Sequence, residues 1–429
     1  MTAAVLPRVM ADDLTAPAGR PRHRAPAGAP PEIVLDLSRL VSRTLHSSPT
    51  GVDRVEMAYA RTLMRRAHHR LSFSAVHPIG VYGRLSASEV ERFLDRTEAR
   101  WEHDGGAERH RQRYAIALRT CLALRPRPVP SLRGSRVLVQ PSPNHLDRRG
   151  VIDSKLRREG ARYVALVHDL IPITHPEYAR PDGAQAHLRR IDTLISCADG
   201  LIANSQATAA ALLSYAGTAL AHRPVRVAPL SPGAMAVGGA GAMLPGEDYF
   251  VCVGTIEPRK NHLLLLNLWR ALIAERGADR TPALVIVGRR GWENENIVDM
   301  LDRCSGLGGR VREFGRMPDA ALRALLRDAR ALLMPSFAEG FGLPVAEALA
   351  MGVPVLASDI AAHREAGGDA PDYLDPLDGA AWRAAILAYA EPRHRRRTAQ
   401  LARIAAWTPA NWDAHIDVVL DLADEVAAC

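Results

Sequence analysis

The fold is indicated most directly by one stretch of sequence, ALLMPSFAEGFGLPVAEALAMGVPVLAS, which spans residues 331–358. It starts with a short apolar run, continues through a glycine-rich loop into a helix-length segment, and ends with the apolar run 353–358. Pro344 suits the first helical position, where its missing N–H costs nothing. A strand, a helix and a second strand in this order are typical of a parallel sheet that helices cover on both faces.

The same alternation continues on both sides of this stretch. Strands of a parallel sheet that is buried on both faces are short and almost continuously apolar. Such runs, each followed by a turn or a helix-length segment, occur upstream at 249–254, 283–288 and 311–315, and in the first half of the chain at 33–37, 136–140, 163–169, 201–205 and 225–228. These runs predict two separate sheets.

A chain of 429 residues also exceeds the usual size of one hydrophobic core. We therefore expect an α/β fold of two Rossmann-like domains, each with a doubly wound parallel sheet, which face each other across a cleft. Residues 80–130 fit the alternation poorly and are interpreted as an insertion without an assigned role. The expected divisions are a disordered tail at 1–31, a first domain at 32–230, a linker at 231–248, a second domain at 249–408 and a C-terminal helix at 409–429.

Composition limits the class of protein. The hydrophobic fraction of 47% is ordinary for a globular chain, and no apolar run reaches the ~18–20 residues that span a bilayer. The first residues lack the layout of a signal peptide, and the five cysteines are scattered singly. We therefore expect a cytoplasmic protein with buried, reduced cysteines and no metal site.

The net charge of +8 comes almost entirely from arginine, because the chain contains only two lysines, Lys155 and Lys260. A basic surface suits phosphate-bearing substrates, nucleic acid or an anionic membrane. Nucleic acid is disfavoured, because aromatic residues make up only 5% and do not alternate with clustered cations. Each retained lysine is informative in such a chain, although Lys155 is expected on a plain helical surface.

The loop within the opening stretch carries groups that suit a phosphorylated sugar. Gly340 and Gly342 let the backbone approach a ligand closely. The amides of Gly342 and Leu343 are expected to point out of a helix N-terminus, where unpaired donors and partial positive charge favour phosphate. Glu339 and Glu347 flank that position and could accept hydrogen bonds from sugar and ribose hydroxyls. The alternative is that both glutamates only complement the helix dipole.

The segment EGFGLPVAEALAMGVPV closely resembles the E-x7-E signature of the retaining glycosyltransferases of family four, which have the GT-B fold. The resemblance covers about residues 249–380. It implies that the second domain binds a nucleotide sugar, that the first domain lies on the acceptor side, and that the last helix crosses back to the first domain. By resemblance, Glu339 approaches the donor sugar and Glu347 the ribose. The remaining donor-binding positions of this loop are Gly340, Phe341, Gly342 and Leu343.

Two further segments of the second domain resemble the same family. In VGTIEPRKNHLLLL (253–266), Arg259 and Lys260 occupy the place of a basic pair that holds the donor diphosphate. Arginine can contact a diphosphate with two parallel hydrogen bonds. In LVIVGRRGWENE (284–295), Arg289 follows a strand and is assigned to the donor phosphates. The alternative for each is an exposed charge on a turn.

The first domain contributes two candidates by resemblance. Gly51 lies in SPTGVDRVE (48–56), after the first strand and before a helix, and looks like a glycine loop close to the donor phosphates. Next to it, Asp53 is interpreted as a helix-start residue or a site residue. His168 ends the run YVALVHD and resembles the histidine that faces the reacting sugar. Ser205 is expected to cap a helix.

The resemblance implies a retaining, metal-independent hexosyltransferase that uses a nucleotide-diphosphate sugar as co-substrate and no other cofactor. His168 and Glu339 are the expected catalytic residues. Bacterial mannosyltransferase-like enzymes of surface polysaccharide synthesis are the most similar members, which favours GDP-mannose, with UDP-sugars close behind. The acceptor is expected to be a glycan or a lipid-linked sugar, with peripheral contact to an anionic inner membrane. A nucleotide-sugar epimerase or phosphorylase on the same fold, or a non-catalytic basic binding protein, stays open as the alternative.

Overall fold

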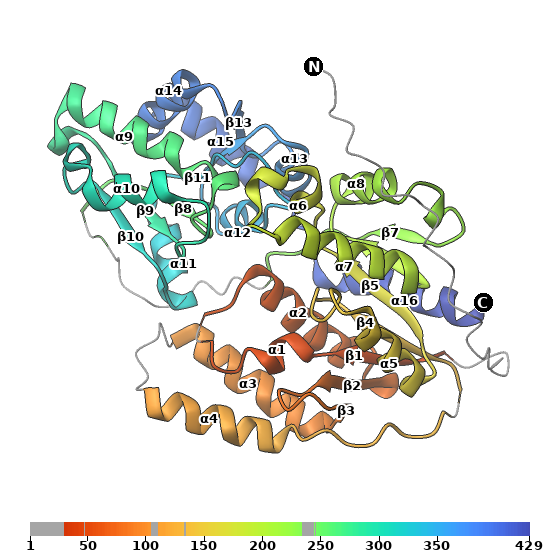
Figure 1. The fold of residues 1–429 in the computed structure, drawn as a ribbon. Helices are drawn as coiled ribbons and strands as arrows, with labels where there is room; N and C mark the ends of the chain where they lie inside the picture. The colour runs from red at the N-terminus through yellow and green to blue at the C-terminus, as the bar shows by residue number, and fades with distance from the viewer. Residues whose placement is uncertain (1–29, 47, 104–109, 133, 234–243, 245) are drawn as a thin grey trace.

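The computed structural model describes residues 30–46, 48–103, 110–132, 134–233, 244 and 246–429, with the side chains of 110–113 excepted. Residues 1–29 of the predicted tail at 1–31, and most of the predicted linker at 231–248, therefore lie outside the described residues. Two sheets, each surrounded by helices, make up the described chain (Figure 1). The prediction of two Rossmann-like α/β domains is confirmed.

Sheet A has seven strands in the order β3-β2-β1-β4-β5-β6-β7. All neighbours are parallel except β2 and β3, which form an antiparallel hairpin at one edge. The segment interpreted as an insertion therefore supplies an edge strand of the sheet, and the expectation of a wholly parallel sheet was wrong at this edge. The strands are β1 (Glu32–Asp36), β2 (Leu71–Val76), β3 (Tyr82–Leu85), β4 (Arg136–Gln140), β5 (Arg162–Val167), β6 (Gly200–Ala203) and β7 (Val225–Val227).

Helices of the first domain cover both faces of sheet A. Apolar side chains of α5 and α7, such as Leu156 and Leu194, pack against one face. Helices α2 and α16 contact each other at the opposite face. The helices are α1 (Ser38–Ser42), α2 (Gly51–Arg66), α3 (Ala87–His103), α4 (His110–Ala123), α5 (Arg149–Glu159), α6 (Ile171–Thr174), α7 (Gly183–Cys197) and α8 (Gln206–Ala216).

Sheet B has six parallel strands in the order β10-β9-β8-β11-β12-β13. They are β8 (Tyr249–Val253), β9 (Ala283–Val287), β10 (Val311–Phe314), β11 (Leu332–Met334), β12 (Val355–Ser358) and β13 (Asp372–Leu374). Trp269 and Trp382 are fully buried where helices cover one face of this sheet. The helices are α9 (His262–Arg276), α10 (Glu295–Arg303), α11 (Asp319–Arg327), α12 (Leu343–Ala350), α13 (Ala361–Gly367), α14 (Gly379–Ala390) and α15 (Arg395–Ala406).

The last helix, α16 (Trp412–Ala428), packs on the first domain although it follows the second domain in sequence. It contacts α2 and strands β4 to β7 of sheet A. The Trp412 ring meets the Tyr59 ring edge-on at 6.2 Å, and the Tyr59 hydroxyl lies 2.7 Å from His415 Nε2. This contact fastens the end of the chain to the first domain.

Lys155 is fully buried in α5, so its expected position on a helical surface was wrong. Its Nζ donates to Asp36 Oδ2 at 2.7 Å and to Gln140 Oε1 at 3.4 Å, and the Asp36 side chain is equally inaccessible. A buried ammonium is tolerated only with such a partner. Sequence periodicity could not indicate this, because the pair joins residues that are far apart in the chain.

The cysteine and membrane expectations have separate outcomes. Cys197 and Cys252 are buried as expected, but Cys121 and Cys304 are half-buried and Cys429 is exposed. None of the five forms a disulfide bond. Among the described residues, no helix is both long enough and apolar enough to cross a membrane.

Candidate functional site

The glycine-rich loop after β11 lies directly against the first domain. A Cβ atom added to Gly340 would sit 2.3 Å from the carbonyl oxygen of His168, so only glycine fits without a shift. The Gly340 carbonyl accepts hydrogen bonds from Ser205 Oγ at 2.7 Å and Thr208 Oγ1 at 3.2 Å. The loop that carries Glu339 therefore forms part of the boundary between the two domains (Figure 1).

The Glu339 carboxylate is held by three side chains. Arg259 donates to Oε2 at 2.7 Å, Ser336 Oγ donates to Oε1 at 2.8 Å, and Lys260 Nζ also bonds Oε1. Burial opposes ionisation of this carboxyl, but Arg259 and Lys260 outweigh it and hold the pKa of Glu339 well below its usual range. Glu339 is therefore a permanent anion between two cations.

Arg259 and Lys260 form the short helix Pro258–Lys260, at the carboxyl end of β8. Arg259 also pairs with Glu257 at 2.7 Å and donates to the carbonyl of Ala338 at 2.9 Å. The positive charges of Arg259 and Lys260 thus equal in number the carboxylates of this cluster, Glu257 and Glu339. A diphosphate that enters would bring surplus negative charge, and the guanidinium and ammonium groups offer several N–H donors each to receive it.

Gly342 is the N-cap residue of helix α12 and has a conformation that favours glycine. Its φ of +91° lies in the left-handed region, and a Cβ there would sit 2.9 Å from Cδ2 of His363. His363 is fully buried and its Nδ1 donates to the Ser358 carbonyl at 2.9 Å. The Phe341 side chain is buried in the core, so only its backbone can face a ligand, while Leu343 is the first residue of α12.

Glu347 lies in the second turn of α12, opposite a pair of charges that joins the domains. Arg54 of α2 forms two hydrogen bonds with Asp319 of α11, at 2.7 and 2.6 Å. Burial raises the pKa of Glu347 to about 7, an effect that Arg54 opposes and Asp319 reinforces. Glu347 is therefore partly protonated near neutral pH. Local sequence patterns do not indicate this pair, because its two residues lie 265 positions apart in the chain.

Gly51 is the first residue of α2, and the space beside it is open. Thr50 and Asp53 form a capping box around this helix start, and Asp53 pairs with Arg39 and Arg43 at 2.7 and 2.9 Å. Of the two interpretations of Asp53, the structure supports the helix-start residue. Contrary to the simple order strand, glycine, helix, α1 lies between β1 and Gly51.

Arg289 reaches across to the first domain instead of joining Arg259 and Lys260. It donates to Ser48 Oγ at 3.1 Å and to the Ser48 carbonyl at 3.3 Å. Burial, together with the nearby cations Arg316 and Arg43, lowers the pKa of Arg289. Arg289 therefore belongs to a second, basic part of the domain boundary.

His168 is fixed as a neutral imidazole at the end of β5. Its Nε2 donates to the Pro141 carbonyl at 2.7 Å, and burial lowers its pKa. This tautomer leaves Nδ1 as a hydrogen-bond acceptor. Asn204 Nδ2 donates to the His168 carbonyl at 2.8 Å, which positions the backbone against Gly340.

Two side-chain contacts across the domain boundary were not predicted from sequence. Glu365 of α13 accepts hydrogen bonds from the amides of Gln206 and Ala207, at 2.5 and 2.8 Å, at the start of α8 in the other domain. Ser205 caps that same helix, as predicted, and also donates to Gly340. No local pattern around Glu365 indicates that its carboxylate reaches the other domain.

An aromatic contact closes the boundary next to this region. Trp292 Nε1 donates to the Tyr178 carbonyl at 2.9 Å, and the Arg180 guanidinium lies 4.5 Å from the centre of the Trp292 ring. The Tyr178 ring stacks on Phe337, with centroids 5.9 Å apart. Tyr178 also stacks on His175.

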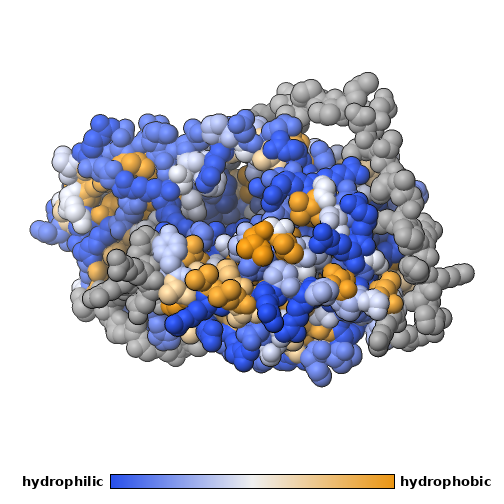
Figure 2. All heavy atoms as spheres, turned by 60° about the horizontal axis from the view of Figure 1, so that its bottom comes forward, coloured by the Kyte–Doolittle hydropathy of each residue, from blue (hydrophilic) through white to orange (hydrophobic). Residues whose placement is uncertain are grey.

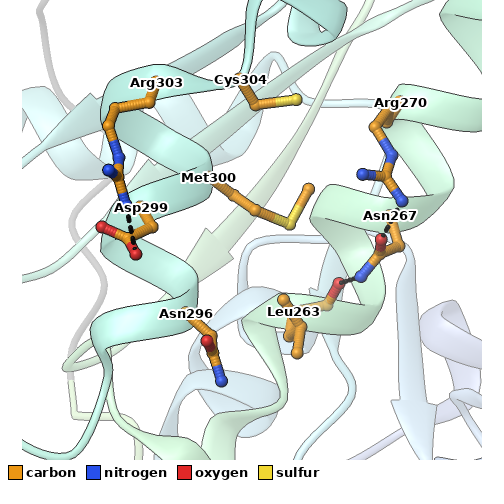
Figure 3. Close-up of a pocket in the computed structure, with 8 residues that line it drawn as sticks. All are labelled: Leu263, Asn267, Arg270, Asn296, Asp299, Met300, Arg303 and Cys304. Atoms are coloured by element: carbon orange, nitrogen blue, oxygen red, sulfur yellow. Dashed lines mark hydrogen bonds and ion pairs between the residues drawn. The ribbon is translucent and has the colours of Figure 1, made fainter.

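One surface hollow of about 440 Å³ lies outside the predicted site, between α9 and α10 (Figure 3). Arg303 pairs there with Asp299 at 2.5 Å, and Arg270 donates to Asn267 Oδ1 at 2.8 Å. None of the predicted site residues lines this hollow. We assign it no role in the site.

The structure thus divides the predicted residues into two groups along the domain boundary. His168, Glu339, Arg259, Lys260 and Gly340 meet at the carboxyl ends of β5, β8 and β11. Gly51, Arg289 and Glu347 lie on other elements, next to cross-domain contacts of their own.

The second domain is similar to known proteins. Residues 247–391 match the family model described as glycosyl transferases group 1. The O-antigen chain mannosyltransferase B of Escherichia coli is 36% identical over 170 residues, which cover 40% of this chain and 44% of that protein. A D-inositol 3-phosphate glycosyltransferase of Gordonia bronchialis is 29% identical over 61% of this chain and 60% of that protein. The chain therefore spans less than two thirds of each of these relatives.

Solved structures with a similar fold cover nearly the whole chain. The α,α-trehalose 6-phosphate synthase of Burkholderia multivorans has a TM-score of 0.60 at 16% identity, and covers 93% of this chain and 99% of that one. Anabaena HepE in complex with UDP-glucose has a TM-score of 0.55 at 16% identity, with coverages of 92% and 98%. At these identities the likeness shows the fold alone.

Proposed function

We propose that this chain transfers a hexose from a nucleotide-diphosphate sugar. Its residues 247–391 match the group 1 glycosyl transferases, and its two sheets form the GT-B fold. The proposed acceptor is a glycan or a lipid-linked sugar in polysaccharide synthesis. Mannose is the favoured sugar, because the Escherichia coli relative is named as a mannosyltransferase. We further propose that the reaction retains the anomeric configuration and needs no metal ion.

One observation carries the proposal. Arg259 and Lys260 hold the Glu339 carboxylate at the carboxyl ends of β8 and β11, where the Gly340 backbone abuts the carbonyl of His168. In open α/β sheets, ligands bind beyond the carboxyl ends of the strands. Cations for a diphosphate, together with a carboxylate and an imidazole for sugar hydroxyls, are therefore combined at one place on the domain boundary.

The proposed chemistry depends on charge stabilisation and positioning. As the bond between the anomeric carbon and the phosphate breaks, Arg259, Lys260 and the amides at the start of α12 stabilise the charge of the leaving diphosphate. Glu339 and His168 hold the sugar hydroxyls, the latter through Nδ1 as acceptor. The leaving phosphate takes the proton of the attacking acceptor hydroxyl on the same face, which accounts for retention.

Calorimetric binding of GDP, UDP and ADP tests the donor site, with Lys260→Ala and Glu347→Ala as variants. Arg270→Ala is a matched control, because it removes a cation from the same domain outside the site. One nucleotide is expected to bind at micromolar affinity without added metal, and both site variants should lose that binding while the control keeps it. If no nucleotide binds the wild-type protein, the transferase proposal fails.

The donor and the stereochemistry need a turnover measurement. GDP-mannose and UDP-glucose are offered with simple mannosides, and the anomeric configuration of the product is read by NMR. Product with inverted configuration would refute the same-face mechanism while it leaves the transferase proposal intact. Turnover that requires a divalent ion would refute metal independence.

A further inference from the structure

Helix α4 presents an apolar surface where a globular protein normally presents polar side chains. Its inner positions, Ala117, Thr120 and Leu124, are buried, the last of them at the position that follows the helix. Its outer stripe contains Leu118 and Leu122, which are 62% and 67% exposed. A surface helix is ordinarily apolar only on the stripe that faces the core. The outer face of α4 therefore has the character of an interaction surface.

The turn between β2 and β3 extends this apolar surface. His77 Nε2 donates to the carbonyl of Cys121, which places the turn next to α4. Ile79 and Val81 of that turn are 71% and 47% exposed. Figure 2 views the face of the molecule that contains these elements and shows hydrophobic side chains gathered among hydrophilic ones.

The sequence of α4 and of the segment that follows it is strongly basic. Residues 110–135 contain six arginines and neither aspartate nor glutamate. Of these arginines, Arg119, Arg125 and Arg127 are exposed in the structure. Exposed leucines framed by exposed arginines complement a surface that is both apolar and anionic.

We propose that α4 and the 77–81 turn form a docking surface for an anionic lipid bilayer. Leu118, Leu122, Ile79 and Val81 enter the headgroup region, while the neighbouring arginines contact lipid phosphates. A second copy of this chain would present the same arginines and repel them, so charge favours the lipid over self-association. The surface does not depend on the sugar-transfer proposal, because lipid binding involves neither donor nor acceptor.

Sedimentation with vesicles tests the docking surface, using phosphatidylcholine alone or mixed with phosphatidylglycerol. The full chain is expected to bind only the anionic vesicles, and added salt should weaken the binding. Leu118→Ser/Leu122→Ser is expected to reduce the partition coefficient by about tenfold or more, and Arg119→Glu should also weaken it. Leu377→Ser is the matched control, because Leu377 is 78% exposed in the other domain.

Light scattering and thermal unfolding accompany the binding assay. All variants should fold like the wild-type protein, because every changed side chain is exposed. Vesicle binding that is equal in the double leucine variant and the wild type would refute the surface, since another segment would then carry the contact. A wild-type dimer that the double leucine variant converts to a monomer would also refute it, in favour of a second copy as the occupant.

Discussion

Substitution of Gly340 by alanine tests whether the two domains must touch for activity. The added methyl carbon would lie 2.3 Å from the carbonyl oxygen of His168, whereas ordinary contact begins at 3.4 Å, so the overlap is about 1.1 Å. Gly340 does not have a positive φ, so alanine introduces no strain in the loop itself. The whole perturbation acts across the domain boundary.

Overlap of this kind costs about 1–3 kcal/mol in a packed contact. Rigid domains can avoid that penalty by separating slightly. The cost should therefore appear as a smaller population of the closed arrangement, in which the two domains touch at Gly340. A shift of this size corresponds to about 5- to 150-fold in the closed population. The specific activity should fall by a similar factor, while nucleotide binding to the second domain and the unfolding temperature change little.

Gly288→Ala is the matched control, because its methyl carbon would lie 1.7 Å from the carbonyl of Gly254 within one domain. That overlap cannot be relieved by domain movement, so this variant should lose thermal stability. Steady-state turnover, calorimetric nucleotide binding and differential scanning calorimetry separate the two outcomes.

Small-angle scattering provides a readout without substrate, since Gly340→Ala should increase the radius of gyration. Wild-type activity and dimensions in Gly340→Ala would refute the reasoning, as would a stability loss equal to that of Gly288→Ala.

Four further substitutions test other parts of the structure. Lys155→Met should lower the unfolding free energy by about 3–5 kcal/mol in urea titrations, because it leaves the buried Asp36 carboxylate without its cation. A Lys155→Met/Asp36→Asn protein that is no more stable than Lys155→Met would contradict the pairing. Burial raises the pKa of Glu347 to about 7, so protonation stabilises the fold below the ordinary value of 4.5 and this stability is lost as the pH rises to 7. The stability of Glu347→Gln relative to the wild type should therefore grow over that interval, and a difference independent of pH would refute the assignment. Glu365→Ala should speed hydrogen exchange at the first two amides of α8, which lose their acceptor; unchanged protection would show that the contact is absent in solution. Gly51→Ala should fold normally in its open space but bind nucleotide more weakly; unchanged affinity would remove Gly51 from the site.

The strands that sequence predicted best are those buried on both faces. Runs such as ALVIV at 283–287 are wholly apolar and coincide with β9. The missed strands lack that pattern, because β2 and β13 contain polar residues and β3 belongs to an edge hairpin. Edge and near-edge strands need fewer apolar side chains, so their sequences resemble loops.

For the site, residue types and spacing identified groups within one loop but not their partners. Arg259, Lys260 and Glu339 were chosen separately, and the structure brings them into one ion-paired cluster. The contacts of Arg54 with Asp319 and of Glu365 with α8 join residues more than a hundred positions apart. Such pairs depend on how the two sheets are placed, which local sequence patterns do not encode. The roles of the site residues in donor binding and catalysis stay predictions.

The burial of both lysines has a practical consequence for chemical labelling. Lys155 is inaccessible and Lys260 is nearly so, and each ammonium group is bonded to a carboxylate. Apart from the α-amino group, the folded protein therefore offers amine-reactive reagents no accessible target, despite its net charge of +8. Reaction of Lys155 requires the first domain to open, whereas reaction of Lys260 requires only that its cluster be exposed. Mass spectrometry of the two modified peptides would thus report global unfolding and opening of the domain boundary as separate rates.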